Sequence, residues 1–110
     1  MIVDHVEGAR SALIEYSLAP TYTTWVFGST SYLCLLAPIQ RTAALFSNGT
    51  NGACDGSLDL DWAAWRAANP NALGNGLLPG QSVYFQASFR DPPAVTGRNL
   101  SDALAVLLCP

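Results

Sequence analysis

Three aspartates in the stretch ACDGSLDLDW are the residues whose type and spacing come nearest to chemistry. Asp59 and Asp61 are two residues apart, so on a β-strand their carboxylates would share one face at about 7 Å. Glycoside hydrolases use such separations, but hydrolysis needs carboxylates that face each other across the bond. Asp59 and Asp61 are nevertheless the candidate catalytic residues, because their separation fits, for a small promiscuous hydrolase of esters, phosphoesters or glycosides. The plainer interpretation is that both are solvated on the exposed face of a strand.

Calcium is the metal that these aspartates are best suited to bind. Asp55, Asp59 and Asp61 lie beside the backbone carbonyls of a glycine-rich loop, and Ca²⁺ prefers such oxygen ligands. The DxDxDG order of a calcium loop does not occur, so we expect ordinary surface aspartates here. Zinc is not expected, because no CxxC pair occurs and the single histidine, His5, stands near the amino terminus. The sequence predicts no cofactor.

Aromatic side chains are numerous for a small domain, and an exposed one could stack on a sugar ring. Tyr84 is the first candidate, because its neighbours Val83 and Phe85 are expected in the core and turn it outward, beside Gln86. Trp65 completes the predicted ligand-binding set of Tyr84, Trp65 and Gln86. For Trp25 and Trp62 the simpler interpretation is burial in the core.

The element that must position these side chains is visible in PGQSVYFQASFRDP. Apolar and polar residues alternate from 82 to 90 between two turns, which predicts a strand with one dry face. We expect Val83, Phe85 and Phe89 to be buried, and Tyr84 and Gln86 to face outward.

Several more short strands are predicted, and turn signals separate them. They cover residues 21–27, 31–39 (apolar on both faces and therefore central), 41–46, 57–62 and 100–108. One helical turn is expected after Trp62. Residues 1–20 show a weak helical period and predict a short amino-terminal helix, through Val6, Ala9, Leu13, Ile14 and Leu18. The fold class is all-β, an antiparallel β-sandwich or jelly-roll-like module over residues 21–110.

Composition excludes some classes of function. The chain has 110 residues, enough for one domain, and a net charge of −3 from five scattered arginines, no lysine and eight acids. A phosphate backbone requires clustered basic residues, so nucleic acid is not an expected partner. No apolar run approaches the roughly 20 residues that span a bilayer, so membrane insertion is not expected. A surface of Ser, Thr, Asn and Gln with only 12% charged residues suits an extracellular β-protein.

Four stretches carry a resemblance: YLCLLAPIQR, ACDGSLDLDW, LLPGQSVYFQASFRDP and NLSDALAVLLCP. Together they resemble an uncharacterised C-terminal module of large secreted bacterial proteins, in which a YFQxxFRDP strand precedes a closing NLSDA strand. The resemblance covers about residues 32–110. It implies a β-sandwich-like, extracellular or periplasmic module at the tail of a longer exported protein, and it implies no established activity. The amino terminus shows no export signal of its own.

Three cysteines leave one unpaired if a disulfide forms. An exported domain of this size favours a disulfide over three free thiols. Modules of the resembled kind often carry both Cys34 and Cys109, which implies a bridge between these two and leaves Cys54 free. Three reduced thiols are the alternative.

These inferences predict a non-enzymatic secreted or surface module that binds carbohydrate or mediates adhesion; the alternative is the aspartate hydrolase above. A homo-oligomer is also expected. No lysine is present to blunt an exposed apolar strand edge, so copies would associate by edge-to-edge pairing or by exchange of the amino-terminal segment. The contact would lie at or near residues 21–36, TYTTWVFGSTSYLCLL.

Overall fold

A computed structural model describes residues 1–109 and confirms the all-β antiparallel class. It contains eight strands, one α-helix and one short 3₁₀-helix. Their bounds are β1 Ile2–Val6, β2 Ser11–Ser17, β3 Pro20–Thr24, β4 Tyr32–Leu35, β5 Gln40–Phe46, β6 Gly56–Asp59, α1 Trp62–Ala68, η1 Leu73–Gly76, β7 Ser82–Arg90 and β8 Arg98–Leu107.

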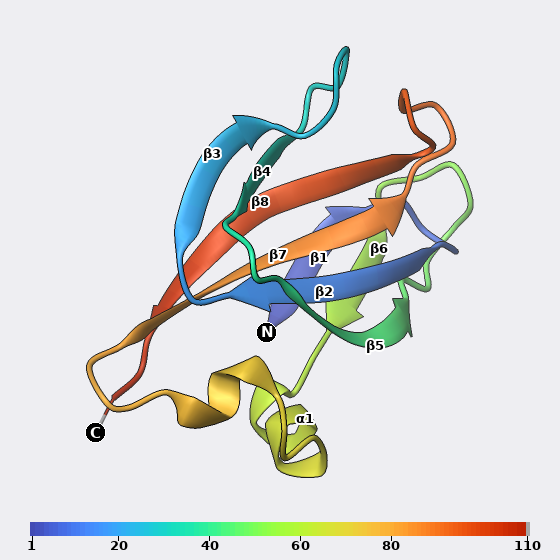
Figure 1. The fold of residues 1–110 in the computed structure, drawn as a ribbon. Helices are drawn as coiled ribbons and strands as arrows, with labels where there is room; N and C mark the ends of the chain where they lie inside the picture. Colours follow the sequence, from blue (N-terminus) through green and yellow to red (C-terminus); the bar gives the residue numbers. More distant parts are fainter. Residues whose placement is uncertain (110) are drawn as a thin grey trace.

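The centre of the molecule is a four-stranded antiparallel sheet in the order β5-β2-β7-β8 (Figure 1). Two antiparallel ribbons, β1–β6 and β3–β4, complete the fold. They lie on opposite faces of the sheet, because side chains that alternate along β2 and β7 contact one ribbon and then the other. We call the face toward β1–β6 and α1 the core face, and the face toward β3–β4 the hairpin face.

The core face carries the apolar set that alternation predicts. Tyr16 and Phe85 lie opposite each other in the β2–β7 register, and both are buried with Ile14 of β2. The rings of Trp62 and Trp65 in α1 meet Tyr16 edge-on at 5.4 and 5.9 Å. The predicted helical turn after Trp62 is thus α1, and it closes one end of the core.

The burial of β7 confirms part of its predicted face assignment. Val83 and Phe85 are buried, whereas Phe89, close to the end of the strand, is half-buried. The outward placement of Gln86 was wrong: this side chain is only 2% exposed, because β4 lies over it. Tyr84 is half-buried.

The amino-terminal helix was also a wrong prediction. Residues 1–20 form β1 and β2, and β2 is an inner strand of the central sheet. Left-handed backbone occurs at His5 (φ 59°), where the register of β1 shifts, and at Ala9 (φ 56°), in the bend between the two strands. The buried Ser47 holds this bend: its hydroxyl donates to the Glu7 carbonyl at 2.7 Å and accepts the Arg10 amide at 3.0 Å. The buried apolar residues of β1 and β2 belong to the same hydrophobic core as those of β7.

The stretch 31–39 is not the predicted central strand. Only Tyr32–Leu35 forms β4, and it pairs with β3 in the ribbon over the hairpin face. Its apolar residues are divided between contact with the sheet and exposure, with Leu35 buried and Leu36 exposed. A strand that is apolar on both sides is fully buried only when other layers of the fold cover both of its faces.

Candidate ligand-binding groove

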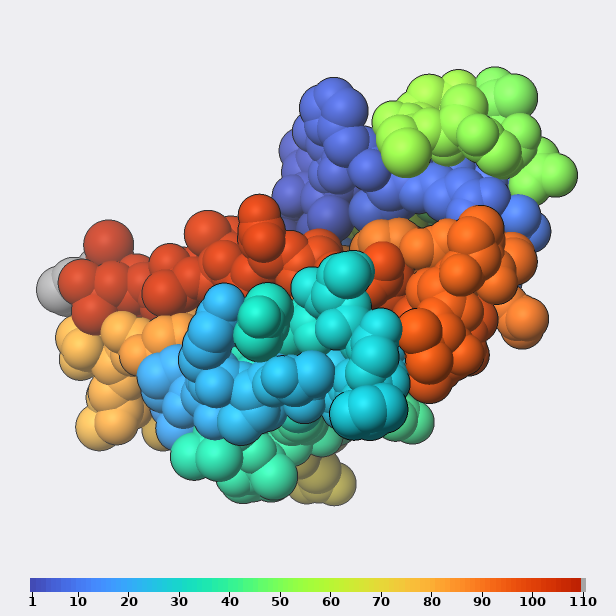
Figure 2. All heavy atoms as spheres, turned by 90° about the horizontal axis from the view of Figure 1, so that it is seen from above, coloured from blue at the N-terminus to red at the C-terminus, as the bar shows by residue number. Residues whose placement is uncertain are grey.

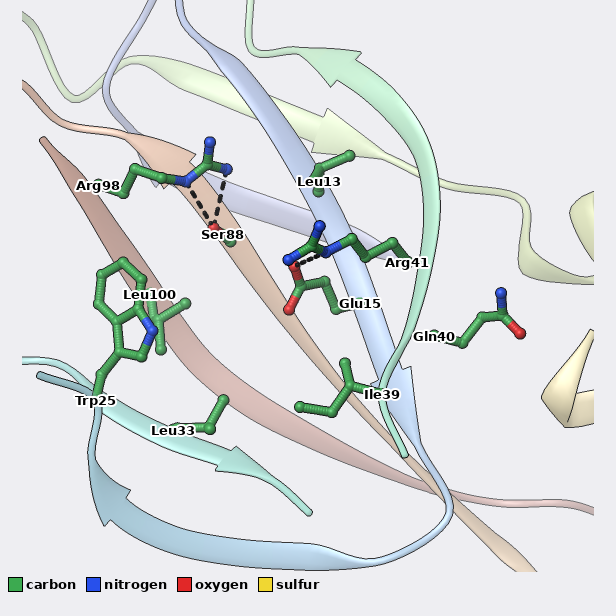
Figure 3. A pocket seen from close by; sticks show the side chains of 10 residues that line it. All are labelled: Leu13, Glu15, Trp25, Leu33, Ile39, Gln40, Arg41, Ser88, Arg98 and Leu100. Carbon is green, nitrogen blue, oxygen red and sulfur yellow. Dashed lines mark hydrogen bonds and ion pairs between the residues drawn. The ribbon is translucent and has the colours of Figure 1, made fainter. Parts of the chain in front are cut away.

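A groove of about 660 Å³ lies on the hairpin face, between the β3–β4 ribbon and β5 (Figure 3). It exists because the ribbon covers the β7–β8 side of the sheet and leaves the middle of that face open. Its apolar lining comes from four elements or their ends: Leu13, Leu33, Ile39 and Leu100. Leu13 belongs to this surface because it alternates with the buried core residues Ala12 and Ile14 along β2.

Two polar pairs stand on this apolar floor. Arg41 of β5 reaches over the sheet to Glu15 of β2, with 3.4 Å between Nε and Oε1. The Glu15 side chain is 14% exposed and the Arg41 side chain 74% exposed, so the carboxylate is sheltered while the guanidinium faces water. Arg98 donates from Nε and Nη2 to the Ser88 hydroxyl, at 3.2 and 3.0 Å.

The charges of these pairs do not balance. Arg41 and Arg98 bring two guanidinium groups to the groove, whereas Glu15 is the single carboxylate among the described residues of its lining. The hydroxyl that accepts both hydrogen bonds from Arg98 is neutral, so the positive charge of Arg98 is not offset within the groove. The groove therefore favours an electron-rich or anionic ligand group.

Trp25 supplies an aromatic wall. It follows β3 directly, and its amide donates to the Ser31 carbonyl at 3.2 Å, which closes the tip of the ribbon. The indole is half-buried and lies beside Leu100 at one side of the groove in Figure 3. The expectation of a core position for Trp25 was wrong. The alternation in TYTTWVF signals one exposed face, but it cannot say which face meets a second layer.

The predicted ligand-binding residues are not brought together. Tyr84 lines a separate hollow of about 500 Å³ with Leu18 and Leu77. Trp65 packs on Tyr16, with its remaining surface in a shallow depression beside α1. Gln86 is buried and does not line the groove.

The aspartates have separate structural settings. Asp55 accepts the Thr50 amide at 2.7 Å, and this hydrogen bond lowers the pKa of its carboxyl below the usual 3.8. Asp59 is exposed on β6, opposite Ile2. Asp61 caps α1 by accepting the Ala64 amide at 2.9 Å, which accounts for the start of the helix. Within residues 1–109, no three potential metal ligands cluster together.

The expected disulfide does not form. Cys34, Cys54 and Cys109 are all free thiols in the described chain. Cys34 lies over Gln86, whose register partner in β8 is Ala103, six residues before Cys109. Six residues of strand extend about 20 Å, far beyond the Cα separation of a disulfide.

The comparisons with known proteins identify no relative. Neither the protein-family models, nor the curated proteins, nor the solved structures include a match to this chain. In the described part of the chain, no helix has the length and apolar character needed to cross a membrane.

Proposed function

We propose that the chain is a non-enzymatic binding module that holds a saccharide in the hairpin-face groove. The observation that carries this proposal is the combination of Trp25 with an apolar floor and the pairs Glu15–Arg41 and Ser88–Arg98. Ligand sites are typically concave and mostly apolar, with a few placed polar groups that orient the ligand.

A sugar ring matches this chemistry on both of its faces. Its C–H face can lie on the Trp25 indole, while its hydroxyls exchange hydrogen bonds with Glu15 and Ser88. The excess guanidinium charge favours a sugar with a carboxylate, because Arg pairs with carboxylates through two parallel hydrogen bonds. A uronic-acid oligosaccharide is therefore the ligand class that we propose.

The proposal includes a location outside the cytoplasm, on an exported or surface protein. It rests on composition: an uncharged polar surface, 12% charged residues and no lysine. The resemblance to the tail module of secreted bacterial proteins points the same way.

Isothermal titration with neutral and uronic-acid oligosaccharides tests the function. We expect the uronic-acid ligands to bind. Trp25→Ala should raise their Kd by about tenfold, because an aromatic contact contributes about 0.5–1.5 kcal/mol beyond its buried area. Trp65→Ala is the matched control, because Trp65 lies outside the groove and should leave the Kd unchanged. Circular dichroism verifies that both variants fold.

Chromogenic esters, phosphoesters and glycosides test the alternative class. We expect no turnover beyond that of buffer. Turnover that disappears in Asp59→Asn or Asp61→Asn would contradict the proposal in favour of a hydrolase. Equal weakening of glycan binding by the Trp25 and Trp65 variants would remove the groove as the site.

A further inference from the structure

The strand β8 forms one edge of the central sheet and is paired with β7 alone among the described strands. Leu108, just after β8, directs both its amide and its carbonyl toward the turn that precedes β7. Its amide donates to the Gln81 carbonyl at 2.9 Å, and its carbonyl accepts the Gly80 amide at 2.8 Å. Successive residues of an antiparallel strand alternate in this direction. The amides and carbonyls of Ala103, Ala105 and Leu107 therefore point outward, away from β7.

The side chains beside these groups give the edge no protection. Residues 103–109 contain no charge, and Leu104 and Leu107 are 46% and 61% exposed. Native edge strands are usually blunted by lysine, proline, a bulge or a cover. Figure 2 shows this part of β8 as an open band, with the β3–β4 ribbon on one side and β1 on the other.

The other end of β8 is covered by the chain itself. The Leu100 amide donates to the Ser31 hydroxyl at 3.2 Å, and the β7–β8 register shifts between Gln86 and Ser88. These features occupy the edge near residues 98–102. The free edge is thus confined to residues 103–107.

We propose that this edge pairs with the same edge of a second copy, antiparallel about a two-fold axis at Ala105. In this register Ala103 meets the second copy's Leu107, and Leu104 meets its Val106, so apolar side chains oppose each other on both faces. The sheet becomes continuous over eight strands across the two copies.

The charges near the edge are compatible with this pairing. Asp102 lies just outside the paired segment, and the two Asp102 residues would stand about 20 Å apart, six strand residues along the ladder. The interface brings no like charges into contact, so its charge pattern is compatible with a two-fold arrangement in which one surface meets its own copy.

The opposite edge of the sheet is less suited to association. Its strand β5 carries the exposed Arg41, and two copies paired there would bring guanidinium groups to the interface. The segment 21–36, where the sequence predicted the contact, lies in the short β3–β4 ribbon, and the proposal moves the contact to β8.

Sedimentation velocity over a wide range of protein concentration tests the dimer. We expect the mass to rise from 11.6 kDa toward twice that value as concentration increases. Leu107→Lys places a charge on the edge, and Ala105→Pro removes an outward amide that the β7 ladder does not use. Both variants should remain monomeric at concentrations where the unmodified chain is dimeric.

Ala43→Lys is the matched control, because Ala43 is an exposed alanine on the β5 edge. It should dimerise like the unmodified chain. A chain that stays monomeric at every concentration would overturn the proposal, as would dimers that persist in Leu107→Lys or that Ala43→Lys abolishes to the same extent. Circular dichroism shows that each variant is folded, so that the Leu107 variant decides the question if Ala105→Pro unfolds.

Discussion

Gln86 links the two layers that form the groove. Its side-chain carbonyl accepts the Cys34 amide at 3.1 Å, and its side-chain amide donates to the carbonyls of Tyr32 and Ser101 at 2.8 and 2.7 Å. One buried side chain thus satisfies backbone groups of β4 and β8. Gln86, which the sequence predicted to be an exposed ligand contact, therefore anchors the β3–β4 ribbon to the sheet.

Replacing Gln86 by leucine should loosen this ribbon. Gln86→Leu keeps a similar volume but leaves the Cys34 amide and two carbonyls without their partner, at about 1–3 kcal/mol for each buried group that stays unsatisfied. Urea denaturation measures the loss of unfolding free energy. Gln81→Leu, in an exposed turn, is the control: it removes one solvent-accessible hydrogen bond, from the Leu78 amide at 2.7 Å, and should change stability by no more than about 1 kcal/mol. Equal effects of the two variants would contradict this role of Gln86.

One face of β7 packs in the apolar core, and its other face carries polar side chains and contacts the β3–β4 ribbon. Phe85→Ala should cost about 3–5 kcal/mol, because it removes a buried ring that meets Tyr16 at 5.8 Å and Trp62 at 5.1 Å. Such a loss approaches the whole stability of a small domain. Tyr84→Ala, at a half-buried position, should be mild. Thermal and chemical denaturation compare them, and a larger loss for Tyr84→Ala would reverse the face assignment.

Short-range alternation was enough to predict some elements and misleading for others. The pattern of residues 82–90 and the alternating Leu58 and Leu60 indicated the right buried face, because each stretch has only one apolar side. In residues 1–20, Leu13 and Ile14 fit a helical period as well as a strand with two contacting faces. Only pairing with β5 and β7, which begin 29 and 71 residues after β2 begins, selects the strand. Such long-range pairing is not visible in a local pattern.

The groove was missed for the same reason. Glu15, Arg41 and Arg98 are scattered over the sequence and meet only when β2, β5 and β8 occupy one sheet. No spacing rule connects them. Trp25 could be noted from the sequence as an aromatic residue, but its exposure depends on how far the β3–β4 ribbon extends over the hairpin face.

At the scale of the whole molecule, one four-stranded sheet must bury two faces with only 110 residues. The ribbon β1–β6 with α1 covers the core face, and the smaller ribbon β3–β4 covers only part of the other face. The uncovered surface includes the groove over β2 and the free edge of β8. Both proposed contacts, with a glycan and with a second copy, lie where this coverage ends.

The central claim is that the groove binds an acidic sugar, and amide and indole chemical-shift mapping by NMR tests it most directly. On titration with an oligogalacturonate, we expect shifts of the Trp25 indole N–H and of the amides of Glu15, Arg41 and Arg98. The Trp65 indole and the amide of Tyr84 should stay unchanged. Shifts centred on Trp65 and Tyr84, or a spectrum that does not change at a saturating concentration, would contradict the claim.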